Sequence, residues 1–124
     1  MNAVPQQQQE EIRRLYDAFN GRDLDAVLER LADDVVWANG WEGGYVEGRP
    51  AVREYWRRQF AVVEPRVEPE EITRTDEGQI AVAVHQVVRS VDEGALLADQ
   101  RVTHLYTFQA GKITRFDIDD SAPA

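Results

Sequence analysis

The two histidines, His85 and His104, are the side chains best suited to chemistry near neutral pH. Imidazole titrates in that range, so each ring could act as an acid or a base without a large environmental shift. The alternative is structural, because a lone histidine on an apolar strand is often a core residue with one satisfied hydrogen bond. Both interpretations depend on which elements carry the two rings and which way the rings point.

Several other kinds of site are excluded or disfavoured by composition. The chain has no cysteine, which rules out disulfides, thiol nucleophiles and zinc–thiolate sites. With two histidines, a three-ligand zinc site would need carboxylates as well. The sequence contains no glycine-rich phosphate loop, no Ser-His-Asp order and no carboxylate pair at metal-ligand spacing. We therefore expect neither a metal nor a cofactor.

The length of 124 residues fits one domain, with residues 1–9 as a disordered polar tail and residues 10–120 as the folded unit. Asp and Glu number 23 against 14 Lys and Arg, a formal charge of −9 that argues against nucleic acid and anionic membranes as partners. No run approaches the ~18 apolar residues of a membrane span, and the N-terminus lacks a signal-like pattern. A cytoplasmic protein is expected.

Three amphipathic helices are predicted in the first half of the chain. Helical spacing joins the apolar side chains of residues 12–19, then those of 24–31, then those of 52–60. Asn20-Gly21 is expected to end the first helix, Asp23 to cap the second, and Pro50 to lie in the first turn of the third. Asp33-Asp34 is taken to close the second helix.

The rest of the chain is predicted to form strands joined by short turns, hence an antiparallel meander. Pro69 makes the first strand of the meander an edge strand or a bulged one. The strand over 79–90 would extend to roughly 40 Å, so it must bend. Because the helices precede these strands, they should gather on one side of a curved sheet. The strands expected are Val35–Trp37 and the ranges 66–75, 79–90, 97–108 and 112–118.

Both faces of the strand over 79–90 are largely apolar at their centres. One face carries Ala83, His85 and Val87, and the other carries Ile80, Val82, Val84 and Val88. A half-solvated antiparallel strand should alternate more cleanly, so both faces are expected to be covered. Helices can cover only one of them. We therefore predict a homodimer in which the outer sheet face of each copy packs on the other.

Three segments of the chain are FNGRDLDAVLERLADDVVW, EGRPAVREYW and VTHLYTFQAGKITRFDI. Together they resemble the nuclear transport factor 2-like superfamily. Within it, the most similar members are the SnoaL-like polyketide cyclases and the ketosteroid isomerases. The resemblance spans roughly residues 10–118. It implies an α+β fold of the cystatin-like type: a cone-shaped, curved antiparallel sheet with three N-terminal helices on its concave face. This scaffold carries enzymes and non-catalytic binders alike, so the resemblance does not fix the activity.

Alignment to the isomerase pattern implies one cavity lined from several elements, with His104 and His85 as its catalytic groups. In that alignment Asn39 replaces the general-base aspartate, Leu15 the oxyanion-hole tyrosine and His104 the carboxylic-acid donor. True ketosteroid isomerisation is therefore not expected. Asp117 is expected to face outward. The glycine-rich loop over 39–48 is interpreted either as a lid or as a surface loop whose aromatic residues fold back on the core. The implied pocket residues are Leu15, Trp37, Asn39, Trp41, Trp56, Val87, Tyr106, Phe108, Phe116 and Ile118.

Two functions follow as hypotheses. The first is a cofactor-free SnoaL-like protein that binds a small apolar, oxygenated compound and performs acid–base isomerisation, cyclisation or dehydration through the two histidines. The second is a non-catalytic ligand-binding or dimerisation module, favoured by the loss of all three isomerase positions. A cavity of roughly several hundred Å³ inside the cone is expected of an enzyme or a small-molecule binder, whereas a dimerisation module can be filled.

Overall fold

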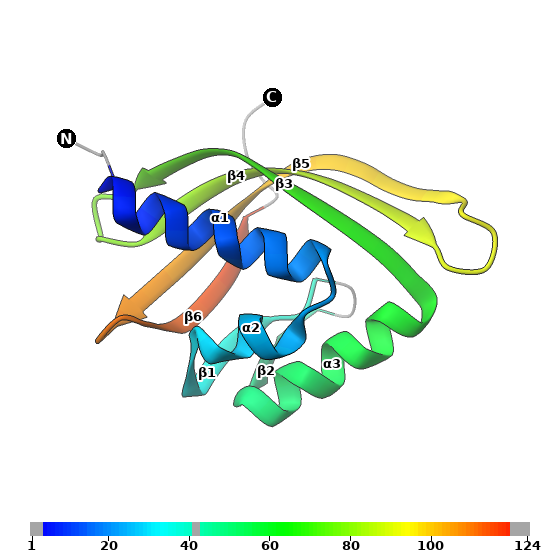
Figure 1. The fold of residues 1–124 in the computed structure, drawn as a ribbon, viewed down its shortest axis with the longest axis horizontal. Coiled ribbons are helices and arrows are strands. Elements are labelled where there is room, and N and C mark those ends of the chain that lie inside the picture. The colour runs from blue at the N-terminus through cyan, green and yellow to red at the C-terminus, as the bar shows by residue number, and fades with distance from the viewer. Residues whose placement is uncertain (1–3, 41–42, 120–124) are drawn as a thin grey trace.

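The computed structural model describes residues 4–40 and 43–119, in which three helices lie on the concave side of one bent sheet (Figure 1). The helices are α1 (Gln6–Asn20), α2 (Leu24–Glu29) and α3 (Arg49–Val62). The predicted α+β fold with a cone-shaped, curved sheet is confirmed. The strands are β1 (Leu31–Ala38), β2 (Tyr45–Glu47), β3 (Val63–Arg74), β4 (Ile80–Ser90), β5 (Leu96–Gln109) and β6 (Lys112–Asp119).

The sheet has the order β2-β1-β6-β5-β4-β3. Strands β3 to β6 form the expected antiparallel meander, and β1 joins it through a parallel pairing with β6. Pro69 lies in β3, which is an edge strand, and the register shifts between Pro69 and Glu71. Both consequences predicted for this proline are therefore present. Part of the loop that we interpreted as a lid is instead the short strand β2.

The helix boundaries follow local chemistry with three differences from the prediction. Helix α1 begins at Gln6, within the range expected to be a disordered tail, because its first turn continues the helix that carries Ile12 and Leu15. Asp23 caps α2 by accepting a hydrogen bond from the Ala26 amide at 3.2 Å, as expected. The left-handed residue after α1 is Arg22 (φ 63°), whereas Gly21 has a φ of −83°. Asp33 and Asp34 lie within β1 instead of closing α2, because Leu31 already pairs with Ile113 of β6.

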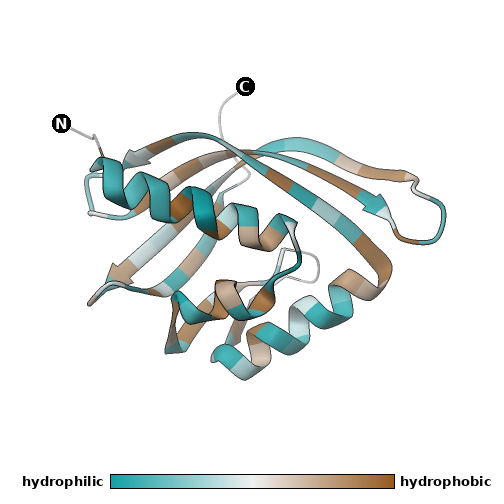
Figure 2. Cartoon of the chain, viewed as in Figure 1, coloured by the Kyte–Doolittle hydropathy of each residue, from teal (hydrophilic) through white to brown (hydrophobic). Residues whose placement is uncertain are grey.

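The core lies between the helices and the concave face, and apolar and polar positions alternate along the strands (Figure 2). Ile80, Val82, Val84 and Val88 of β4 are each no more than 2% exposed and belong to this interior. The sequence analysis placed these four on the outer, dimer-forming face, and that assignment was wrong. The parity of β4 is reversed: its outer face carries the half-buried Ala81, Ala83, His85 and Val87. Within the described residues, no helix is long and apolar enough to span a membrane.

Candidate functional site

A cavity of about 160 Å³ lies between the concave face of the sheet and the helices, and it is smaller than the several hundred Å³ expected from the sequence. Helix α1 contributes one wall, α3 a second, and the inner face of β4, β5 and β6 the floor. Most of the lining is apolar or aromatic, as in small-molecule sites generally. Its residues are Leu15, Tyr16, Phe19, Val27, Trp37, Ala38, Gly40, Tyr55, Trp56, Val67, Gln86, Val88, Ala98, Gln100, Val102, His104, Tyr106, Phe116 and Ile118.

His104 of β5 is the buried polar residue of the floor, with 7% of its surface exposed. Its Nδ1 lies 2.6 Å from the hydroxyl of Tyr16, and the Tyr106 hydroxyl donates to the Tyr16 oxygen at 2.9 Å. Alternation along β5 puts His104 and Tyr106 on the same face. Helical spacing puts Tyr16 on the buried side of α1 with Ile12 and Phe19. A relay Tyr106–Tyr16–His104 therefore joins a helix to the sheet at the cavity.

Burial determines the protonation states of the three side chains in this relay. It lowers the pKa of His104 to about 3, so the imidazole is neutral at physiological pH. Burial likewise raises the pKa of Tyr16 and of Tyr106 above that of a free tyrosine, so both remain protonated. A neutral imidazole with so low a pKa is a weak base. It remains a good hydrogen-bonding group, and the hydrogen bond between Nδ1 and the Tyr16 hydroxyl leaves Nε2 as the second ring nitrogen.

Two tryptophans give the cavity its aromatic walls. Trp37 stacks on Phe116 with ring centroids 4.2 Å apart, and Phe116 in turn meets His104 edge to face at 4.9 Å. Trp56 of α3 packs edge to face on Phe19 at 4.7 Å. The indole nitrogens of Trp37 and Trp56 are both buried and have no hydrogen-bond partner within the described part of the chain. Each is a donor without an acceptor.

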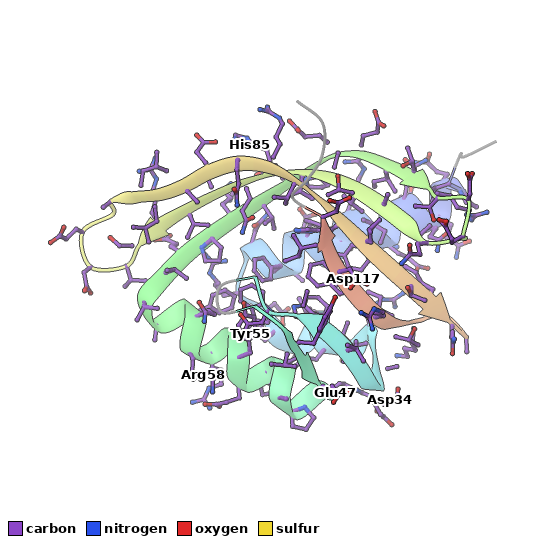
Figure 3. All side chains as sticks on the ribbon, turned by 180° about the vertical axis from the view of Figure 1, so that it is seen from behind. Asp34, Glu47, Tyr55, Arg58, His85 and Asp117 are labelled. Carbon is purple, nitrogen blue, oxygen red and sulfur yellow. The ribbon has the colours of Figure 1, made fainter. Side chains whose placement is uncertain are left out.

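His85 does not reach this cavity. In the β4–β5 pairing His104 lies opposite Val82, whereas His85 lies opposite Arg101, so the two rings are on opposite faces of the sheet. His85 is on the convex side (Figure 3), where its Nε2 lies 2.6 Å from Asp99 Oδ1. The expectation that two histidines converge on one ligand is therefore wrong. The reason is the reversed parity of β4.

Three more implied pocket residues lie outside the described lining. Val87 shares the outer face of β4 with His85. Phe108 packs against the edge of the core, after a register shift between Thr107 and Phe108 that breaks the alternation of β5. Asn39 is flanked by Ala38 and Gly40, which do line the cavity. Trp41 falls outside the described residues.

The other implied pocket residues lie together at the cavity. They come from α1, β1, α3, β5 and β6, which are far apart in sequence and meet only through the fold. These residues are Leu15, Trp37, Trp56, His104, Tyr106, Phe116 and Ile118.

The sequence profile of the SnoaL-like domain matches residues 12–116, nearly all of the described chain and every element around the cavity. The chain belongs to the SnoaL-like domain family. No curated protein matches this SnoaL-like domain in sequence.

Solved structures agree with that assignment. An NTF2-like protein of unknown function from Burkholderia pseudomallei is 28% identical, with a TM-score of 0.78 over 90% of this chain and 88% of that one. A candidate polyketide cyclase from Xanthomonas campestris is 27% identical, with a TM-score of 0.70 over 86% and 84% of the two chains. A second candidate polyketide cyclase, from Sinorhizobium meliloti, is 26% identical, with a TM-score of 0.71 over 94% and 95%.

Asp117, which lies between the lining residues Phe116 and Ile118 of this SnoaL-like domain, is outside the cavity lining. It accepts a hydrogen bond from the Tyr45 hydroxyl at 2.6 Å and two from the Arg115 guanidinium. Partial burial would raise the pKa of Asp117, but these hydrogen bonds hold it below its ordinary value. No Asp, Glu, Lys or Arg is among the described residues that line the cavity.

Sequence reasoning missed the hub of the relay, Tyr16. The alignment to the isomerase pattern used the preceding residue, Leu15, and both side chains line the cavity. A signal was present, because Tyr16 is the member of the apolar stripe Ile12, Leu15, Tyr16 and Phe19 that carries a hydroxyl. Gln86 gave a similar signal, as a polar residue among the valines of the inner face of β4.

Proposed function

We propose that this SnoaL-like domain binds a small apolar, oxygenated compound in the cavity between α1, α3 and the sheet. The observation that carries the proposal is a neutral, buried imidazole at the floor of an aromatic cavity, bonded to the protein through Nδ1. Polar groups that fix the orientation of a ligand within an apolar enclosure are typical of such sites. The SnoaL-like family and its candidate polyketide cyclases are consistent with a ligand of this kind.

The test is binding of 1-indanone, a compact aromatic ketone, followed by quenching of tryptophan fluorescence, because Trp37 and Trp56 are cavity residues. Ala98→Trp places a bulky ring in the lining of the cavity and should abolish binding. Leu97→Trp is the matched control, since Leu97 is the adjacent residue on β5, is 52% exposed and is not among the described residues that line the cavity. Equal binding by the two variants would refute the cavity as the site.

A catalytic function is the second candidate, supported by the relay that ends at the cavity. His104 would act mainly by donating a hydrogen bond to a substrate oxygen, because a base with a pKa of about 3 removes protons poorly at neutral pH. An isomerase, cyclase or dehydratase without metal or cofactor would then depend on substrate polarisation. His104→Gln should reduce turnover by about 100-fold while His85→Gln leaves it unchanged. Equal effects of the two substitutions would remove His104 from the chemistry.

The remaining partners are proposals too. We propose a cytoplasmic homodimer that binds neither nucleic acid nor membrane, and that pairs through the outer face around Ala81, Ala83 and Val87. These half-buried apolar residues now replace the valines that we first assigned to this face. Ala83→Arg should halve the mass measured by light scattering without unfolding the chain. A wild-type mass of one chain would contradict the dimer.

A further inference from the structure

We infer that the cavity selects ligands whose buried end presents hydrogen-bond-accepting oxygens, as an aryl ketone or a quinone does, because the Tyr106–Tyr16 relay fixes His104 as a hydrogen-bond donor. The inference rests on the proposed function and names the chemical class of its ligand. It follows from the direction of the relay and from the other polar atoms around the cavity.

The direction of the relay is set at Tyr106. The Tyr106 hydroxyl is bonded to the Tyr16 oxygen, and Tyr106 is 3% exposed, so its proton is directed to Tyr16 and not to water. Tyr16 thus accepts from Tyr106, and its own single proton points to Nδ1 of His104, 2.6 Å away. Nδ1 must then carry a lone pair. A neutral imidazole in that state holds its proton on Nε2, so the nitrogen left for a ligand is an N–H donor.

The other unsatisfied polar atoms are donors as well. The buried indole nitrogens of Trp37 and Trp56 lack an acceptor among the described residues, and a buried donor without an acceptor is costly. An oxygen that reached either indole, directly or through a water molecule, would remove that cost. The described lining contains no carboxylate that could accept a proton from a donor ligand. Gln86 and Gln100 supply amides, which both donate and accept.

The tautomer itself can be observed without any ligand. A long-range ¹H–¹⁵N correlation spectrum of the wild-type protein at pH 7 should show His104 with its proton on Nε2. Tyr106→Phe removes the group that fixes the direction of the relay while keeping the ring, so His104 should become a mixture of tautomers. A purely structural role for Tyr106 would leave the spectrum unchanged and would overturn the relay, as would a wild-type ring protonated on Nδ1.

The ligand class is tested with a matched pair, 1-indanone and indane, which share a ring frame and differ by the carbonyl oxygen. The ketone should bind the wild-type protein about tenfold more tightly, the effect of one well-formed hydrogen bond in a buried site. His104→Phe should abolish that preference, and His85→Phe on the outer face should retain it. Equal affinities for the two probes in the wild-type protein would overturn the inference while leaving the proposed binding intact. Failure of both probes to bind would overturn the proposed function and the inference together.

Discussion

His104 and His85 lie on neighbouring strands of one sheet, yet they occupy opposite environments. His104 is 7% exposed, bonded to a tyrosine and surrounded by aromatic rings. The His85 side chain is 31% exposed and pairs with the carboxylate of Asp99. Burial makes the first a hydrogen-bonding group that is neutral at physiological pH, whereas the second lies among the charges of a surface. The difference comes from strand parity alone, because adjacent residues of a strand point to opposite faces.

The largest effect should come from placing the same charge on the two faces of β4. Val84→Arg buries an unpaired guanidinium in a site with no exposed surface, and should cost about 4 kcal/mol or more of the free energy of unfolding. Ala83→Arg, on the outer face, should cost about 1 kcal/mol or less. Urea unfolding measured at low protein concentration compares them. Similar midpoints for the two variants would contradict the assignment of Val84 to the inner face and of Ala83 to the outer face.

A medium effect is expected from the protonation of His104. Its pKa is about 3 in the folded chain and about 6.5 when unfolded. The unfolded state therefore binds more protons below pH 6.5, and the stability present above that pH is lost progressively as the pH falls toward 3. Between pH 7 and pH 5 this residue alone should remove about 2 kcal/mol.

The measurement is urea unfolding at the two pH values for the wild-type protein and for His104→Gln. The variant should lose the His104 share of the pH dependence, whereas His85→Gln should keep it. If the wild-type protein and His104→Gln have the same pH dependence, His104 is accessible to protons in the folded state, and the contrast between the two histidines disappears.

The smallest effect is expected on the outer face. Asp99→Asn removes the charge that faces His85, and the Asp99 side chain is 53% exposed, so the free energy of unfolding should change by less than ~0.5 kcal/mol. Added salt should reduce the effect further. Unfolding at low and high ionic strength is the check. The measurement is made at a protein concentration at which the chain is monomeric, because the proposed homodimer would cover this face. A loss above ~1 kcal/mol under those conditions would show that Asp99 and His85 are more than a solvent-screened surface pair.

Local sequence signals predicted most of the fold. The helices could be predicted from apolar spacing, the α2 cap from Asp23, and the irregular edge strand from Pro69, since each depends on the chemistry of a few neighbouring residues. The parallel pairing of β1 with β6 could not be predicted in this way. It joins residues that are far apart in the sequence, such as Leu31 and Ile113, and no local pattern encodes that contact.

The site was less predictable because it depends on parity and register. Both faces of β4 are apolar enough to be buried, so alternation did not identify the inner one. Side-chain type was the better guide: the inner face carries β-branched aliphatic residues such as Val82 and Val84, and the outer face carries Ala83, His85 and Arg89. Because the inner and outer faces of β4 are the reverse of those predicted, His85 lies outside the cavity. The polar group beside His104 is the hydroxyl of Tyr16.

The position of β6 also affects how the protein is made. This strand is the last along the described chain, yet it lies between β1 and β5 and supplies Phe116 and Ile118 to the cavity. During synthesis, α1, α2, β1 and α3 emerge from the ribosome long before the strand that joins β1 to the meander. Until β6 has been synthesised, the apolar faces of these early elements therefore stay exposed to solvent, a state prone to aggregation. The cavity can be completed only after nearly the whole domain has been translated.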